Sequence, residues 1–107
     1  MKIVRTRTYL KDLKRMGVSV AEAAVIEHTI SSDPEAGDVI KGLDGIRKMR
    51  FAFGGRGKRG GGRAVYFLMV SDDMAAMLFA YAKNEQTDLT PDQRKQALRL
   101  MKEIRDG

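Results

Sequence analysis

Two apolar, strand-like runs separated by a glycine-rich loop constrain the fold of this chain more than any other feature. The runs cover residues 46–53 and 63–71, and the loop between them, residues 54–62, holds six glycines and three cations. The first run alternates apolar and basic residues, as a strand with one buried face does. The second run is apolar on both faces, which is typical of a central strand covered on both sides. The sequence therefore predicts a β-hairpin that carries a basic loop.

Positive charge is concentrated in the same stretch. No acidic residue lies between Asp44 and Asp72, whereas seven of the twenty lysines and arginines do. These seven are Arg47, Lys48, Arg50, Arg56, Lys58, Arg59 and Arg63. Because like charges repel and no acid nearby in the sequence neutralises them, the patch predicts a surface that binds phosphate. The alternative is a solvated basic loop that maintains solubility.

The remaining composition narrows the class of protein. A chain of 107 residues supports one domain, so we expect residues 1–107 to form a single domain. The net charge of +6 indicates an anionic partner. With no cysteine and one histidine, neither a disulfide framework nor a usual zinc site is expected, and we expect no metal and no cofactor. The N-terminus lacks the apolar core of a signal peptide and no run is long enough to span a bilayer, which predicts a cytoplasmic protein without membrane contact.

The N-terminal third is predicted to be a short strand followed by two helices. Residues 2–5 fit a strand, and apolar residues at helical spacing from Tyr9 to Met16 predict a helix that Gly17 ends. Ser19-Val-Ala-Glu22 has the form of a capping box, and the helix it starts is expected to run to about residue 31. Two short helices joined by a glycine-containing turn must bury their apolar faces, and we expect them to pack on the sheet.

The rest of the chain completes an α+β fold. Residues 37–45 read as a connector with a small amphipathic turn, and residues 74–82 as a strand that returns antiparallel to the preceding one. Thr90-Pro-Asp-Gln93 is a strong helix start, and the buried stripe of that helix is expected to contain Leu98, Met101 and Ile104. The order β-α-α-β-β-β-α predicts an N-terminal helical hairpin packed on a mainly antiparallel four-stranded sheet, with a C-terminal helix.

Lys83 ends the last predicted strand, where an apolar run meets polar chain. In an antiparallel meander this end lies at the same edge of the sheet as the start of the strand at residue 63 and the loop before it. We therefore expect Lys58, Arg63 and Lys83 to converge on one site, although they are far apart in the sequence.

Several short motifs follow one another in a fixed order between Asp33 and Thr90. They are Gly37-Asp-Val-Ile40, Gly42 with Gly45, Arg47-Lys-Met-Arg50, Gly57-Lys58, Gly61-Gly-Arg63, Tyr66, Lys83-Asn-Glu85 and Asp88-Leu-Thr90. In these residues the chain resembles the RelE/ParE superfamily of bacterial toxins, and within it the HigB-like branch. The fold of that superfamily agrees with the element order predicted above.

The resemblance implies a function and its partners. Most RelE-like proteins are ribosome-dependent mRNA endoribonucleases (mRNA interferases) of type II toxin–antitoxin systems, and a cognate antitoxin protein neutralises them. Their partners are the ribosome and mRNA, and they need no small-molecule cofactor. The reaction is attack of a ribose 2′-hydroxyl on the adjacent phosphate, which expels the 5′-oxygen. Without a metal this requires a base, an acid and cations around the phosphate.

Roles for individual residues follow from the resemblance. Lys58 or Lys83 would act as general base or acid, and Arg63 would bind the phosphate through its planar guanidinium. Four further cations would hold the flanking RNA or ribosomal RNA backbone: Lys48, Arg50, Arg56 and Arg59. Many RelE-type nucleases carry a tyrosine or histidine near or beyond the end of the sheet, and this chain has neither after Lys83. The identity of the acid and of the base therefore stays open.

Two other functions compete with the nuclease. A non-catalytic toxin on the same scaffold, like the ParE proteins that inhibit DNA gyrase, is one alternative. A nucleic-acid-binding module without toxicity is the other. ParE-like chains generally lack a cationic nuclease cluster, so the acid-free stretch favours the nuclease.

Overall fold

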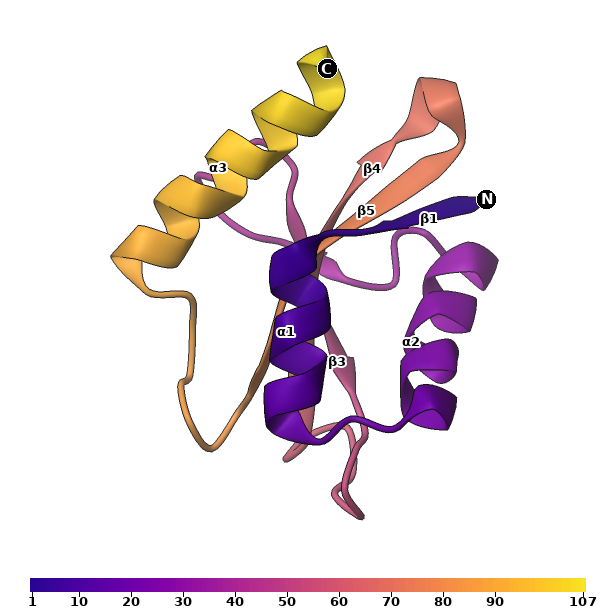
Figure 1. The fold of residues 1–107 in the computed structure, drawn as a ribbon, viewed down its shortest axis with the longest axis vertical. Coiled ribbons are helices and arrows are strands. Elements are labelled where there is room, and N and C mark those ends of the chain that lie inside the picture. Colours follow the sequence, from indigo (N-terminus) through magenta and orange to yellow (C-terminus); the bar gives the residue numbers. More distant parts are fainter.

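The computed structural model describes residues 1–107 as a five-stranded sheet between two helical layers (Figure 1). Along the chain the elements are β1 (Lys2–Arg5), α1 (Arg7–Met16), α2 (Val20–Ser32), β2 (Asp38–Val39), β3 (Arg47–Phe51), β4 (Gly62–Met69), a 3-10 turn (Val70–Asp72), β5 (Met74–Ala82) and α3 (Pro91–Asp106). The strand order is β1-β5-β4-β3-β2, in which β1 and β5 are parallel and every other pair is antiparallel. The α+β class and the mainly antiparallel sheet are confirmed.

The predicted number of strands is wrong by one. Residues 38–39, expected in a turn, form the edge strand β2, where Asp38 pairs with Lys48 and Val39 with Arg47. Two residues are too few to show the alternation by which a strand is recognised in a sequence. The pairing depends on a partner strand, so only the tertiary structure reveals it.

The helices begin and end at the residues that cap them. The Thr6 hydroxyl accepts from the amide of Tyr9 at the start of α1, and Gly17 ends this helix in the left-handed conformation, with φ 76°. The capping boxes predicted at Ser19 and Thr90 are both present at the starts of α2 and α3. No helix of the structure combines the length and the apolarity needed to cross a membrane.

Each face of the sheet carries its own apolar core. On one face, α1 and α2 contribute residues such as Tyr9 and Ile30, which pack with Phe51 and Met77. The α3 helix covers the other face through Ala97 and Met101. The predicted stripe of α3 is therefore only partly right: Met101 is buried, but Leu98 and Ile104 are half-buried and Ala97 takes the central position. A small residue lets the helix backbone approach the sheet closely.

Candidate functional site

The strand register places cations of β3 and β4, and the lysine that follows β5, on one face of the sheet. Arg50 of β3 lies opposite Arg63 of β4, and Arg63 lies opposite Tyr81 of β5. The ladder continues one step further, because the amide of Lys83 donates to the carbonyl of Gly61 at 3.0 Å. Side chains alternate along a strand, so Lys83 points to the same face as Tyr81. This is the α3 face, near the glycine loop and away from the part of the sheet that α3 covers (Figure 1).

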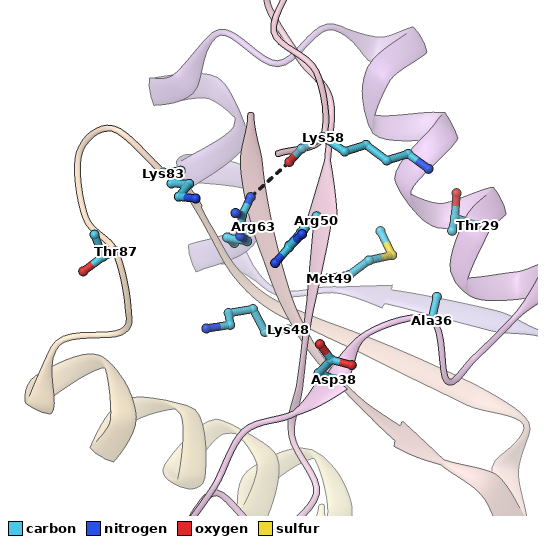
Figure 2. A pocket seen from close by; sticks show the side chains of 10 residues that line it. All are labelled: Thr29, Ala36, Asp38, Lys48, Met49, Arg50, Lys58, Arg63, Lys83 and Thr87. Carbon is cyan, nitrogen blue, oxygen red and sulfur yellow. Dashed lines mark hydrogen bonds between the residues drawn. The ribbon is translucent and has the colours of Figure 1, made fainter. Parts of the chain in front are cut away.

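These cations line an open cavity of about 650 Å³ (Figure 2). The residues around it are Thr29, Ala36, Asp38, Lys48, Met49, Arg50, Lys58, Arg63, Lys83 and Thr87. All three predicted catalytic residues and two of the four predicted RNA-binding residues are among them. The predicted meander thus brings the end of β5 and the start of β4 to one place.

Arg63 is the buried centre of the cavity. Only 7% of it is exposed, and its guanidinium donates to the backbone carbonyls of Lys58, Arg59 and Gly62 at 2.9–3.2 Å. No carboxylate pairs with it, and none of these bonds uses its Nε–H. Burial, and then the positive charge of Arg50, lower the pKa of Arg63. A buried cation with only carbonyl partners, beside a second cation, is an environment that an anion stabilises.

Lys58 does not join the other two cations. Its carbonyl oxygen faces Arg63 and accepts the bond described above, but its side chain extends away toward Thr29 on α2 (Figure 2). Lys83 and Arg63 lie together at the opposite side of the cavity. The predicted convergence of three side chains is therefore a convergence of two, and Lys58 contributes its backbone.

Acidic residues from outside the basic stretch reach the cavity. Asp88 lies 3.6 Å from the Lys48 ammonium, and Asp38 lines the cavity from β2. The expectation that nothing neutralises the patch is thus wrong for Lys48 and also for Arg47, whose guanidinium lies 3.5 Å from the carboxylate of Glu35. Arg50, Arg63 and Lys83 form no ion pair. Asp38 and Asp88 were not predicted to belong to the site, because they lie beyond the acid-free stretch and only the β2–β3 pairing and the loop after β5 bring them there.

Residues 1–106 match the family described as RelE toxin of the RelE/RelB toxin–antitoxin system. The chain belongs to the RelE toxin family. A free mutant of the E. coli toxin RelE has a similar structure, with a TM-score of 0.60 and 12% identity over 92% of this chain and 94% of that one. The isolated E. coli RelE toxin gives a TM-score of 0.56 and 15% identity over 92% and 97%. The finer placement in the HigB-like branch stays a prediction.

Two cations assigned to RNA binding lie outside the cavity of this RelE-family toxin. Arg56 stands over the ring of Phe53, 5.6 Å from its centroid, and borders a separate groove. Arg59 contributes its carbonyl to Arg63, and its side chain is exposed on the glycine loop. Neither forms an ion pair. Both belong to the glycine loop and its flank, next to the cavity that Lys58 and Arg63 line.

Lys83 is held in place by a network on the other side of β5. Strand β1 pairs with β5 only up to Met77, which leaves the edge amides of Ala80 and Ala82 without a strand partner. The carboxylate of Asp12 accepts from Ala80 at 3.0 Å, and that of Glu85 accepts from Ala82 at 2.8 Å. Satisfied edge amides fix the end of the strand, and with it the turn that starts at Lys83.

Tyr81 is the aromatic residue nearest in register to Arg63, but it does not replace the missing tyrosine or histidine. Its hydroxyl is buried and makes no hydrogen bond, and the residue does not line the cavity. Burial raises the pKa of Tyr81 to about 12, so its hydroxyl remains neutral. Within the RelE-family site, Tyr81 serves as part of the apolar core under Arg63.

Proposed function

We propose that this toxin is an endoribonuclease that cleaves mRNA on the ribosome, with the scissile phosphate bound in the cation cavity. The observation that carries the proposal is Arg63, a buried guanidinium without a carboxylate partner, next to the unpaired cations Arg50 and Lys83. A phosphodiester supplies the charge that these three residues lack. Its antitoxin, which membership of a toxin–antitoxin family implies, neutralises the activity.

The proposed reaction uses the RNA's own nucleophile. The 2′-oxygen attacks phosphorus, a P–O2′ bond forms, and the bond to the 5′-oxygen breaks, which leaves a 2′,3′-cyclic phosphate. The 2′-hydroxyl proton passes to a base, and the departing 5′-oxygen receives a proton from an acid. Arg63 and Arg50 stabilise the negative charge that accumulates on the non-bridging oxygens.

Of the two lysines assigned to proton transfer, Lys83 is the better placed acid. Its side chain lies beside Arg63 in the cavity and its backbone is fixed by the bond to Gly61 (Figure 2). Lys58 reaches the same phosphate only after its side chain turns back from Thr29. Lys48, Arg56 and Arg59 would hold the flanking RNA or ribosomal RNA backbone.

The test is induced expression followed by primer extension on cellular mRNA. The wild-type chain is expected to arrest growth and to produce new mRNA ends at codon-linked positions. Arg63→Ala is expected to abolish both, and the fold of the variant is checked separately, because the buried Arg63 donates to three carbonyls of the glycine loop. Arg99→Ala, which removes an exposed cation on α3, is the matched control and keeps both effects.

Three outcomes would contradict the proposal. Growth arrest with intact mRNA and damaged DNA would indicate gyrase inhibition. No arrest would indicate a binding module. Full cleavage by a folded Arg63→Ala protein would remove the phosphate from this cavity.

A further inference from the structure

The carboxylate of Glu22 joins the start of α2 to the glycine loop, residues 54–62. One of its oxygens accepts from the amide of Ser19 at 2.9 Å, which is one half of the capping box. The other oxygen accepts from the amide of Gly54 at 2.8 Å, a bond that the capping box does not require. The amides of Ser19 and Gly54 lower the pKa of Glu22, so the carboxylate stays ionised and holds both donors.

The bond to Glu22 is the only hydrogen bond that joins residues 54–60 to an element outside the β3–β4 hairpin. The other bonds of this segment are internal to the hairpin, such as that from the amide of Arg56 to the carbonyl of Phe53 at 3.0 Å. All residues of the segment are exposed, so burial in the core does not fix it. The position of the loop relative to the helices therefore depends on Glu22.

The glycine loop in turn holds two cations of the proposed nuclease site. The carbonyls of Lys58 and Arg59 accept from the guanidinium of Arg63, each at 3.2 Å (Figure 2). At the end of the loop, the carbonyl of Gly61 accepts from the amide of Lys83. A β-carbon at Gly61 would collide with backbone carbonyls of β3 and of the loop itself, so the two ends of the loop pack tightly. A displacement at the start of the loop is thus transmitted to the carbonyls that orient the cations.

We propose that Glu22 is a positioning residue of the nuclease. Its bond to Gly54 holds the glycine loop, and the loop carbonyls hold the guanidinium of Arg63 in the direction of the phosphate. Glu22 does not line the cation cavity, so it acts through the loop and not on the RNA. Donors that are fixed before the reaction need no reorganisation in the transition state, and a small displacement of them lowers the rate strongly. The inference rests on the proposed nuclease function.

The alternative is that Glu22 serves only as a cap of α2, and the chain allows the two roles to be separated. Ser19→Ala removes the hydroxyl half of the capping box and leaves the bond from Gly54 to Glu22 in place. Glu22→Ala removes both bonds of the carboxylate. Glu22→Gln has a single acceptor oxygen, because its NH₂ group only donates, so it accepts from Ser19 or from Gly54 but not from both.

The experiment measures single-turnover cleavage of mRNA on ribosomes over a range of toxin concentrations, and hydrogen exchange of the Gly54 amide in the free chain. Glu22→Ala is expected to lower the maximal rate about tenfold. The half-saturating concentration is expected not to rise, because the loss of an acid does not weaken the attraction of the basic loop to RNA. Glu22→Gln is expected to lose cleavage only as far as the Gly54 amide loses protection. Ser19→Ala is the matched control, which is expected to be less stable but to cleave at the wild-type rate.

Wild-type cleavage by Glu22→Ala would overturn the proposal. An equal loss of cleavage in Ser19→Ala would also overturn it, because the effect would then come from the helix cap. A loss in Glu22→Gln while the Gly54 amide stays protected would exclude the loop as the link. A higher half-saturating concentration at an unchanged maximal rate would assign Glu22 to RNA or ribosome binding instead. Failure of the nuclease function itself is seen separately, as an absence of cleavage by the wild-type chain, and this inference would fall with it.

Discussion

Two arginines approach the end of β5 from opposite sides and differ in how their charge is balanced. Arg15 of α1 is about half exposed and pairs with Glu85 at 2.6 Å and Asp12 at 3.2 Å. The hydrogen bond to Glu85 raises the pKa of Arg15. Arg63 is buried, has no carboxylate, and has a lowered pKa. The comparison separates a cation that is paired with carboxylates of the fold from one that no carboxylate of the fold pairs.

The largest expected effect on cleavage comes from changing the shape of Arg63, the arginine without a carboxylate partner. Arg63→Lys keeps the charge but removes the planar donor set, and cleavage is expected to fall about 10²- to 10³-fold. Arg15→Lys keeps an ion pair at the protein surface and is expected to leave cleavage unchanged. Primer extension on the same mRNA measures both variants. Equal cleavage by Arg63→Lys and the wild-type chain would show that Arg63 acts only as a point charge.

A carboxylate placed in the cavity would give Arg63 an internal counter-charge, as Arg15 already has. Thr87 lines the cavity from the loop after β5, so Thr87→Asp supplies an internal anion that competes with phosphate. Cleavage is expected to fall about tenfold at low salt, and less at high salt, where the added charge is screened. Thr87→Asn, which is similar in size and uncharged, is the control. A salt-independent loss, or an equal loss in Thr87→Asn, would point to a steric effect.

Arg15, the arginine that is paired with carboxylates, is expected to affect the stability of the fold and not the cleavage of mRNA. Arg15→Ala removes the partner of Glu85 and Asp12 at an exposed position, and the free energy of unfolding is expected to fall by up to about 1 kcal/mol. Urea denaturation measures this change. Cleavage is expected to stay the same, because Glu85 still accepts from Ala82 and Lys83 remains bonded to Gly61. A loss of cleavage without a loss of stability would place Arg15 in the site.

The smallest effect is a pH dependence of the same ion pair. The hydrogen bond from Arg15 lowers the pKa of Glu85 below 4.5, so the ionised carboxylate stabilises the folded state. This contribution is complete above about pH 4.5 and is lost as the pH falls through the folded-state pKa. The stability difference between the wild-type chain and Glu85→Gln is therefore expected to shrink below that pH. A difference that is constant down to pH 3 would rule out the contribution of ionisation.

Some features of the fold and of the site could be predicted from the sequence and others could not, as individual residues show. The capping boxes at Ser19 and Thr90 predict their helices because caps are local signals. The alternation around Met49 and Phe51 predicts which face of β3 is buried. The same reasoning failed at Asp38, whose strand exists only through its pairing with Lys48. It also failed at the side chain of Lys58, because the direction of a side chain on a glycine loop depends on its neighbours in space.

The sequence by itself determined the order of the helices and of every strand except β2, the antiparallel meander of β3, β4 and β5, and the meeting of Arg63 with Lys83, because periodicity and strand direction are properties of the chain. The tertiary structure decided which charges are neutralised. Asp12 and Glu85 pair with Arg15 and accept hydrogen bonds from the edge amides of β5. Asp88 pairs with Lys48, whereas no carboxylate pairs with Arg63. Charge balance depends on distances across the fold, and distances of a few ångströms between residues far apart in sequence are fixed only when the sheet and helices pack.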